Sequence, residues 1–330
     1  MKALVYTDIK TLTFKEEKIA VANDDEELIK VDAAGICGSD MHAYHGLDER
    51  KIPPLILGHE ISGIKLKNNT PVVMNPLITC MKCQDCLNGR EHLCIKRESI
   101  GTSKPVLRSG GFAEFVAAPK RNIFSVSTNM NLHHVALTEP TAVALHAVKI
   151  AENNSFTNLD QSNILIIGGG AIGLLVALVL ETKEANNITI LDTNQKRLNV
   201  CQQASSSLIA HPNDKRIKTN SYDIVFDAVG FENTRRKSIE CIKQGGIIIH
   251  MGLSQSSGEF DFRKTTLQEI TFFGTFCYTN NDFKRSLDML IAKELGDLTW
   301  LDYRPLKDGA AAFREIHDST TSSPKIILIP

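Results

Sequence analysis

The feature that most constrains the fold of this chain is an apolar run that ends in a glycine-rich turn. The run Ile164–Ile167 meets Gly-Gly-Gly-Ala-Ile-Gly at 168–173 and continues into the helical pattern of Leu174–Glu181. Further strand-like runs follow at helix-length intervals, at Ile188–Leu191, Leu208–Ala210, Ile224–Ala228, Gly246–Met251 and Ile270–Phe276. Apolar strands without alternation are buried on both faces. The middle of the chain is therefore predicted to form a doubly wound parallel sheet of the α/β class.

The glycine turn itself indicates a dinucleotide site. A strand ends at Gly168, a helix begins near Gly173, and Asp192 closes the next strand about 20 residues later, as the dinucleotide fingerprint requires. The glycines would let the backbone approach a pyrophosphate at the positive end of the helix, and Asp192 would bind the ribose hydroxyls. The bland alternative is an ordinary tight turn, with Asp192 as a helix cap.

The acid at Asp192 would also repel a 2′-phosphate, which favours NAD over NADP. Lys196 and Arg197 follow closely and could neutralise such a phosphate, so NADP remains the alternative. Residues at the carboxyl ends of later strands are expected to line the nicotinamide half. The predicted cofactor contacts are Gly168, Gly170, Ile172, Gly173, Asp192, Arg197, Val229, Gly252 and Leu253.

The two ends of the chain show different residue patterns from the middle. The first 135 residues contain short β patterns with Gly- and Pro-marked turns, at Lys2–Tyr6, Glu27–Ala34, Glu60–Leu66, Pro71–Met74 and Phe112–Ala117. Helical spacing begins near Leu132 and runs to Ile150, and Asn213–Tyr222 is too short for a full crossover helix. The last 50 residues predict two helices, Phe283–Ala292 and Gly309–His317, and a strand, Lys325–Ile329, that returns to the first half.

Four cysteines form the most specific local motif. Cys80, Cys83, Cys86 and Cys94 have C-x2-C-x2-C-x7-C spacing. Four thiolates so close together can enclose a tetrahedral zinc ion that holds a loop and performs no chemistry. The motif predicts a structural zinc, against the alternative of four unrelated thiols.

Composition narrows the possible partners. The chain of 330 residues has a net charge of -1 with dispersed Lys and Arg residues, which gives no reason to expect nucleic acid or an anionic membrane as a partner. The start lacks a signal-peptide pattern, and no run approaches the roughly 18–20 apolar residues that cross a bilayer. A cytoplasmic protein with reduced thiols is expected, in which clustered cysteines bind metal.

Two further segments carry a family motif. Cys37 lies in GICGSDMH (35–42), and His59-Glu60 lies in GHEISG (58–63). Taken singly, Cys37 could be a buried thiol, His59 a core histidine and Glu60 a surface acid. Together, and with the cysteine lobe and the glycine turn, they resemble the zinc-containing medium-chain dehydrogenase/reductases over essentially the whole chain.

The resemblance implies a second, catalytic zinc. Cys37 and His59 would be ligands, with a carboxylate from Glu60 or from Glu139. Ser39 and His42 would relay the substrate proton to solvent, and Asp40 would support a zinc ligand. The catalytic residues implied by the family are thus Cys37, Ser39, His42, His59, Glu60 and Glu139.

Glu139 indicates which branch of the family the chain resembles. Many alcohol dehydrogenases have a cysteine here, whereas polyol, sorbitol-type and threonine dehydrogenases have this Glu-Pro pair. A carboxylate suits a substrate that approaches zinc through two oxygens. Other phrases are similar to bacterial sequences such as galactitol-1-phosphate dehydrogenase, although only Lys104 and Arg108 are candidates for binding a phosphate.

The family resemblance implies a GroES-like β-rich catalytic domain over 1–137, with a zinc lobe at about 76–98. A Rossmann NAD-binding domain over 138–279 and a returning segment over 280–330 complete the expected organisation. The resemblance implies a zinc-dependent polyol or sugar-alcohol dehydrogenase that uses NAD, acts on a substrate with or without a phosphate, and forms a homodimer or homotetramer. The alternatives are a threonine dehydrogenase-like or simple secondary-alcohol dehydrogenase, and a non-enzymatic NAD sensor or structural protein.

Overall fold

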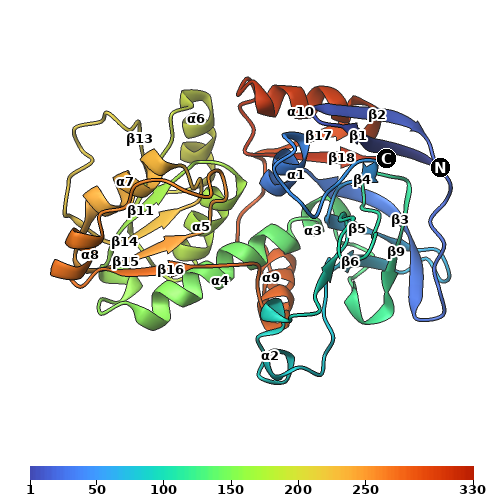
Figure 1. The fold of residues 1–330 in the computed structure, drawn as a ribbon, viewed down its shortest axis with the longest axis horizontal. Helices are drawn as coiled ribbons and strands as arrows, with labels where there is room; N and C mark the ends of the chain where they lie inside the picture. The colour runs from blue at the N-terminus through green and yellow to red at the C-terminus, as the bar shows by residue number, and fades with distance from the viewer.

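The computed structural model describes residues 1–330, and its chain forms two halves that lie side by side (Figure 1). One half is built on a six-stranded parallel sheet in the order β13-β12-β11-β14-β15-β16. Its strands are β11 (Asn163–Ile167), β12 (Asn187–Leu191), β13 (Leu208–Ala210), β14 (Tyr222–Asp227), β15 (Ile242–His250) and β16 (Thr271–Gly274). The prediction of a doubly wound parallel sheet is confirmed.

Both faces of the central strands of this sheet are buried. In β11, Ile164 and Ile166 join one hydrophobic cluster, whereas Leu165 and Ile167 join another. Successive side chains of a strand point to opposite faces, so an all-apolar strand has a core on each side. The helices of this half are α4 (Thr138–Asn154), α5 (Ala171–Glu181), α6 (Gln195–Ala204), α7 (Glu232–Cys241), α8 (Phe262–Leu267) and α9 (Asn280–Ile291).

The other half is rich in β-structure. Its main sheet has the order β10-β6-β5-β3-β18-β17, with β9 also paired to β3, and a smaller sheet has the order β2-β1-β4. These strands are β1 (Lys2–Asp8), β2 (Thr11–Glu16), β3 (Glu26–Gly35), β4 (Leu55–Ile56), β5 (Glu60–Lys65), β6 (Pro71–Met74), β9 (Phe115–Pro119), β10 (Ile123–Ser125), β17 (Leu301–Pro305) and β18 (Lys325–Ile329). Helices α1 (Gly38–Tyr44), α3 (Leu132–Val135) and α10 (Gly309–His317) pack around them.

The last strand pairs on one side with a strand that is far away in the sequence. β18 pairs antiparallel with the end of β3, with Ile327 opposite Gly35. The chain therefore passes through the parallel-sheet half and ends in the sheet of the N-terminal half, as the colours of Figure 1 show. This return places Lys325 beside the residues that follow β3.

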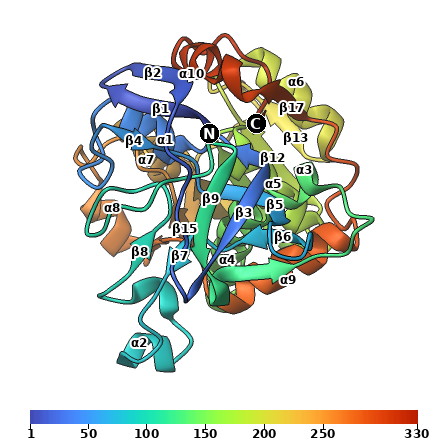
Figure 2. The ribbon, with the colours of Figure 1, turned by 90° about the vertical axis from the view of Figure 1, so that its right-hand side faces the viewer.

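A small lobe projects from the body in both Figure 1 and Figure 2. It contains α2 (Gln84–Leu87) and is joined to the body by β7 (Leu77–Ile78) and β8 (Glu98–Ser99). The lobe carries the four clustered cysteines. No helix of the structure combines the length and apolar character that a membrane crossing needs.

Some boundaries differ from the sequence expectations. The strand expected at Phe112–Ala117 is β9, which begins only at Phe115. Phe112 lies in the preceding loop, where its carbonyl accepts a hydrogen bond from Leu4 N at 2.8 Å. β17, with the polar sequence LDYRP, was not predicted since it lacks an apolar pattern. The short interval after β13 forms only turns before β14 begins at Tyr222, which confirms the absence of a full crossover helix.

Candidate active site and metal centres

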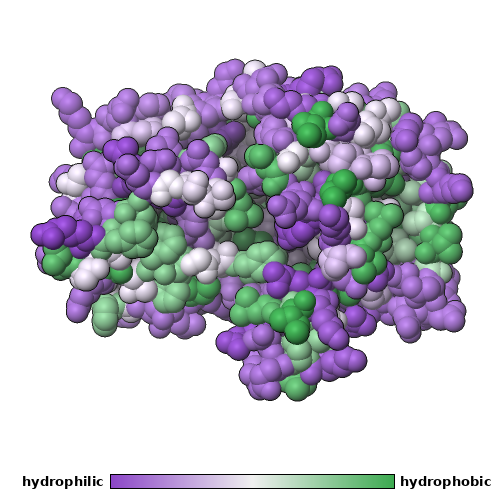
Figure 3. All heavy atoms as spheres, in the orientation of Figure 1, coloured by the Kyte–Doolittle hydropathy of each residue, from purple (hydrophilic) through white to green (hydrophobic).

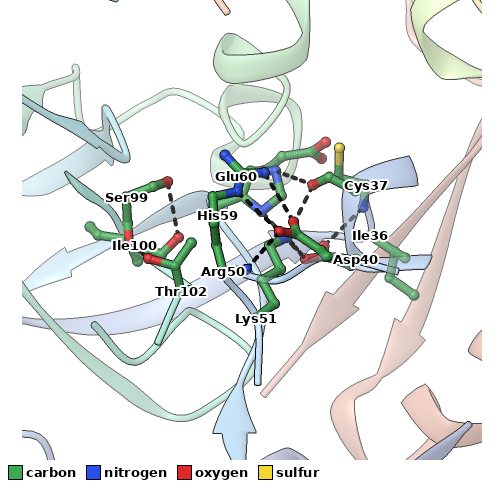
Figure 4. A network of polar contacts seen from close by, with 12 residues as sticks. Ile36, Cys37, Asp40, Arg50, Lys51, His59, Glu60, Ser99, Ile100 and Thr102 are labelled. Carbon is green, nitrogen blue, oxygen red and sulfur yellow. Dashed lines mark hydrogen bonds and ion pairs between the residues drawn. The ribbon is translucent and has the colours of Figure 1, made fainter. Parts of the chain in front are cut away.

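The first cluster of metal-binding side chains is produced by the pairing of β3 with β5. Gly35 at the end of β3 lies opposite Glu60 at the start of β5, so Cys37 comes next to His59 and Glu60. The donor atoms of these three residues all lie within 4.8 Å of one another. His59 and Glu60 are buried, and Cys37 is partly exposed. Two neighbouring strands thus bring a thiol, an imidazole and a carboxylate to one point (Figure 4).

A glycine is required opposite the carboxylate. A Cβ atom added at Gly35 would lie 1.9 Å from Oε2 of Glu60. Real Cβ atoms do not approach an oxygen that closely, so any larger residue would displace the Glu60 side chain. Gly35 therefore leaves the space in which the acidic group of the cluster lies.

Two buried lysines lie near this cluster. Lys325 Nζ donates to both carboxylate oxygens of Glu60, at 2.6 and 2.7 Å, and to the carbonyl of Ile36 at 2.9 Å. Lys51 Nζ donates to Oδ1 of Asp40 at 2.9 Å. Lysine is almost never buried unless it is paired, and both of these are paired with a buried acid.

Asp40 connects the Lys51 pair to the cluster (Figure 4). Its Oδ2 accepts from the backbone N–H of Cys37 at 3.2 Å, and its Oδ1 lies 3.5 Å from Nδ1 of His59. Burial acts to raise the pKa of Asp40, but Lys51 and His59 hold it well below its usual range. Asp40 is therefore an anion beneath the cluster, and it orients His59 so that Nε2 faces away from it.

The surroundings of His59 favour a cation at this point. Burial alone would lower the pKa of His59, yet Asp40 and Cys37 raise it above the usual value despite the opposing effect of Lys51. Nε2 of His59 has only a long contact of 3.4 Å, with Ser39 Oγ. A thiol, an imidazole nitrogen and a carboxylate form a donor set that suits zinc. The residues present thus fit the expected catalytic metal ion.

Glu139 lies next to the three clustered donors and is not one of them. It is in the first turn of α4 and buried. Burial, together with the charge of Glu60, raises its pKa to about 7, while His59, Lys325 and the Tyr278 hydroxyl act to lower it. Of the four predicted catalytic ligands, the structure brings three together and places the fourth within electrostatic range.

The predicted relay residues lie on α1. Ser39 Oγ is 3.4 Å from Nε2 of His59 and accepts a hydrogen bond from Lys51 Nζ at 3.1 Å. His42 follows one turn later, is half-buried, and makes no side-chain hydrogen bond. Burial lowers the pKa of His42, with Asp48 opposing and Lys51 adding to this effect. His42 is thus poised as a neutral imidazole near the surface.

Sequence reasoning missed three polar residues of this site: Lys51, Lys325 and Tyr278. Lys325 had a signal, because a lysine at the head of the apolar strand KIILI is unusual if that strand is buried. Lys51 follows a run of charged residues that is typical of a solvated loop. Arg108, expected as a candidate phosphate contact, instead pairs with Glu26 and Glu98, which neutralise it.

The second cluster is the cysteine lobe. The sulfur atoms of Cys80, Cys83, Cys86 and Cys94 all lie within 4.8 Å of one another. The Sγ atoms of Cys83 and Cys86 are 3.5 Å apart, and those of Cys80 and Cys86 are 3.9 Å apart. The spacings are those of thiolates around a single tetrahedral ion and are far too long for a disulfide. The lobe thus fits a structural zinc.

The glycine turn has the geometry of a phosphate cradle. Gly168 has φ +106°, and a Cβ added at Gly173 would lie 1.8 Å from the Gly168 carbonyl oxygen. A Cβ added at Gly170 would meet nothing within 4 Å, so open space borders the N-terminus of α5 at this residue. Ile172 is the second residue of α5. The arrangement fits a pyrophosphate bound to the helix N-terminus.

Asp192 lies at the carboxyl end of β12 beside this turn. Its Oδ2 accepts from the backbone N–H of Gly169 at 2.7 Å, and Arg197 Nη1 lies 3.3 Å from the same oxygen. The sequence expectation that Asp192 and Arg197 lie near the glycine turn therefore matches their positions. They form an ion pair with each other, so neither charge stands alone.

The predicted nicotinamide side lies at the ends of β14 and β15. Gly230 has φ +83°, and a Cβ there would lie 2.3 Å from the backbone of Gly252. The loops that carry Val229 and Gly252 are therefore in backbone contact. Leu253 is 63% exposed, and its side chain is free to contact a ligand at this edge of the sheet.

Comparison with known proteins identifies the family. Residues 23–128 match the family described as the alcohol dehydrogenase GroES-like domain, and residues 171–292 match the family described as zinc-binding dehydrogenase. The chain belongs to the zinc-binding dehydrogenases. It is an oxidoreductase, and the resemblance to the zinc-containing medium-chain family is confirmed.

Individual relatives are similar over most of their length. L-galactonate-5-dehydrogenase of Escherichia coli is 29% identical over 302 residues, which cover 86% of each chain. L-idonate 5-dehydrogenase of Vitis vinifera is 28% identical, over 82% of this chain and 79% of that protein. The structure of galactitol-1-phosphate dehydrogenase from Escherichia coli superposes with a TM-score of 0.86 at 24% identity, over the full length of both chains.

Proposed function

We propose that this dehydrogenase transfers a hydride between a secondary hydroxyl of a polyol or sugar-derived substrate and NAD. The observation that carries the proposal is the convergence of Cys37, His59 and Glu60 within 4.8 Å, in the same chain as a glycine turn that can hold a dinucleotide. A sensor that only bound NAD would need the glycine turn and would not need a partly exposed thiol beside a buried histidine.

Two bound groups complete the proposed site. Zinc held by Cys37 and His59 would supply Lewis acidity towards the substrate hydroxyl, and NAD would accept the hydride. Glu60 and Glu139 are the alternative carboxylate ligands. Glu60 lies among the clustered donors but has Lys325 on both of its oxygens, whereas Glu139 lies outside the cluster and has no lysine partner.

The chain itself handles the proton. Ser39 Oγ accepts the proton of the substrate hydroxyl as hydride leaves carbon, and His42, one turn along α1, passes a proton outward. The lowered pKa of His42 keeps it neutral, with a free lone pair, near neutral pH. In the reductive direction the same groups return a proton to the product.

The NAD preference rests on Asp192. A carboxylate at the end of β12 would accept from the ribose hydroxyls of NAD and would repel a 2′-phosphate. Arg197, at 3.3 Å from that carboxylate, partly offsets this repulsion. We therefore expect a preference for NAD that is moderate in size.

The substrate class rests on the carboxylates and on the relatives. Acids in place of a further thiolate make the site suitable for a substrate with several oxygens. Relatives are named for L-galactonate, L-idonate and D-xylulose, all of which are polyhydroxylated. A polyhydroxylated substrate is thus favoured over a simple alcohol.

The protein is further proposed to be cytoplasmic and to form a homodimer or homotetramer. β16 is an edge strand of the parallel sheet, and nearby Phe262, Leu267 and Phe272 are exposed by 72%, 68% and 38%. An unpaired strand edge with exposed apolar side chains is suited to contact a second copy. Figure 3 shows apolar residues gathered on the same half of the molecule, and a recess between the two halves.

The proposal is tested by following NADH formation with a panel of alcohols. The panel contains galactitol-1-phosphate, sorbitol, L-idonate, L-threonine and 2-butanol, each with NAD and with NADP. We expect the highest kcat/KM with a polyhydroxylated substrate and NAD. A preference for 2-butanol or threonine would refute the substrate class, and no turnover by zinc-loaded protein would refute the enzymatic proposal.

A further inference from the structure

Lys51 is a buried cation next to the predicted proton relay, and the family resemblance assigned it no role. Its side chain is 3% exposed, and its Nζ donates at once to Asp40 Oδ1 at 2.9 Å and to Ser39 Oγ at 3.1 Å. The backbone on either side is anchored, because Ile52 N donates to Ser103 Oγ and Ser103 N donates to the Arg50 carbonyl. Lys51 is thus held firmly in place.

We propose that Lys51 is a positioning residue for proton transfer, which fixes the Ser39 hydroxyl as the group that exchanges a proton with the substrate alcohol. This inference rests on the proposed dehydrogenase function. The ammonium also places a positive charge on the side of His59 where Ser39 lies, so that negative charge on the substrate oxygen is stabilised there.

The direction of the hydrogen bonds supports this role. An ammonium group has donors and no acceptor, so Ser39 Oγ must accept from Lys51. The contact between Ser39 and His59 Nε2, at 3.4 Å, is long, and a metal ion on Nε2 would remove it. The second lone pair of Ser39 Oγ is then free to accept the substrate proton, and its single O–H is free to donate along the relay towards His42.

The charges around His59 also support the proposed role of Lys51. Three buried carboxylates lie near His59, and two of them are each paired with a buried lysine: Glu60 with Lys325, and Asp40 with Lys51. Without Lys51, the uncompensated charge of Asp40 would oppose the formation of an anionic oxygen nearby. Lys51 is the member of the two pairs that also reaches a relay residue.

The balance of the step is simple. In the oxidative direction the substrate O–H bond breaks as a proton moves to Ser39 Oγ, and the Ser39 proton moves on towards His42 and solvent. The C–H electron pair leaves as hydride to NAD. Lys51 gives and takes no proton in this sequence, because it acts through the geometry and charge that it gives to Ser39.

The test compares Lys51→Met, Lys51→Gln, Ser39→Ala and the double variant Lys51→Met/Ser39→Ala with the parent enzyme, on the best substrate of the panel. We expect kcat to fall about 10–100-fold in Lys51→Met, a part of the usual contribution of proton transfer to catalysis. The pH limb that reports deprotonation of the bound alcohol should move upward by about one unit. KM for NAD and the zinc content should stay at parent values.

Two comparisons separate positioning from a structural effect. The double variant should be no slower than the slower single variant, because both changes remove the same proton path. Lys51→Gln keeps a donor to Ser39 and removes the charge, so it should recover part of kcat and retain the shifted pH limb, and it serves if Lys51→Met does not fold.

Additive losses in the double variant would overturn the proposal, as would an unshifted pH limb in both Lys51 variants. A loss of zinc from the Lys51 variants that is large enough to explain their lower kcat would also overturn the proposal. Lys51 would then hold the metal site together and would not act through Ser39. A parent enzyme with no activity on any alcohol would instead refute the proposed function, so the two failures are distinguishable.

Discussion

The buried pair between Lys325 and Glu60 joins the last strand of the chain to the centre of the candidate site, and its removal should be costly. Lys325→Met preserves the length of the side chain and deletes the charge. Glu60 would then be a buried carboxylate without the two hydrogen bonds at 2.6 and 2.7 Å, and the Ile36 carbonyl would lose its donor.

The size of the effect follows from burial. The Lys325 and Glu60 side chains are 2% and 0% exposed, so water cannot replace the missing partner. Removing one member of a buried ion pair costs about 3–5 kcal/mol of unfolding free energy. At roughly 2 °C per kcal/mol for a chain of this size, the melting temperature should fall by about 6–10 °C.

The assay is thermal unfolding of zinc-loaded protein, with a matched surface control. Lys183 and Glu152 form an ion pair at 3.0 Å with both side chains more than one-third exposed, so Lys183→Met should cost less than about 1 kcal/mol. The double variant Lys325→Met/Glu60→Gln should be more stable than Lys325→Met alone, because it removes the unpaired charge. If Lys325→Met lowers the melting temperature no more than Lys183→Met does, the buried pair does not stabilise the fold as proposed.

Three further changes test separate parts of the molecule. Cys86→Ala should remove one zinc ion per chain and lower the melting temperature before it affects the chemical step, as metal analysis and unfolding would reveal; a stable variant with full zinc content would contradict a structural site. Asp192→Asn should lower the preference for NAD over NADP by about tenfold in kcat/KM, and an unchanged ratio would show that Asp192 does not select the cofactor. Burial acts to raise the pKa of Asp282, but hydrogen bonds from His146 and Lys149 hold it well below its usual range. The contribution of the ionised Asp282 to stability is therefore complete above about pH 4 and is lost as the pH falls towards the pKa of the folded state. The gap in melting temperature between the parent and Asp282→Asn should therefore be constant near neutral pH and shrink below about pH 4; a gap that widens in acid would contradict this sign.

The parallel-sheet half could be predicted from sequence because its signals are local. A strand such as Ile164–Ile167 is apolar throughout, and the glycine turn follows it directly. The type of each element, the order of the elements along the chain and the dinucleotide ligand could therefore be inferred from neighbouring residues. The polar strand at Leu301–Pro305 has no such pattern and is defined by its pairing with β18.

The site could be predicted only in part. The ligands Cys37 and His59 are embedded in short motifs, whereas the Lys325 partner of Glu60 lies 265 positions away and is brought near by the pairing of β18 with β3. The role of Lys51 depends on the loop conformation that turns its side chain inward. Long-range pairing and loop geometry are not encoded in any local pattern, which is why both lysines were missed.

The central claim is that Cys37 and His59 hold a zinc ion that serves catalysis and is distinct from the zinc of the cysteine lobe. The most direct measurement is the zinc content of Cys37→Ser, taken together with its NAD affinity and its rate of NADH formation. We expect two zinc ions per chain in the parent and one in the variant, with NAD binding retained and turnover abolished. A variant that keeps the parent's rate, at whatever zinc content, would contradict a catalytic zinc at Cys37 and His59.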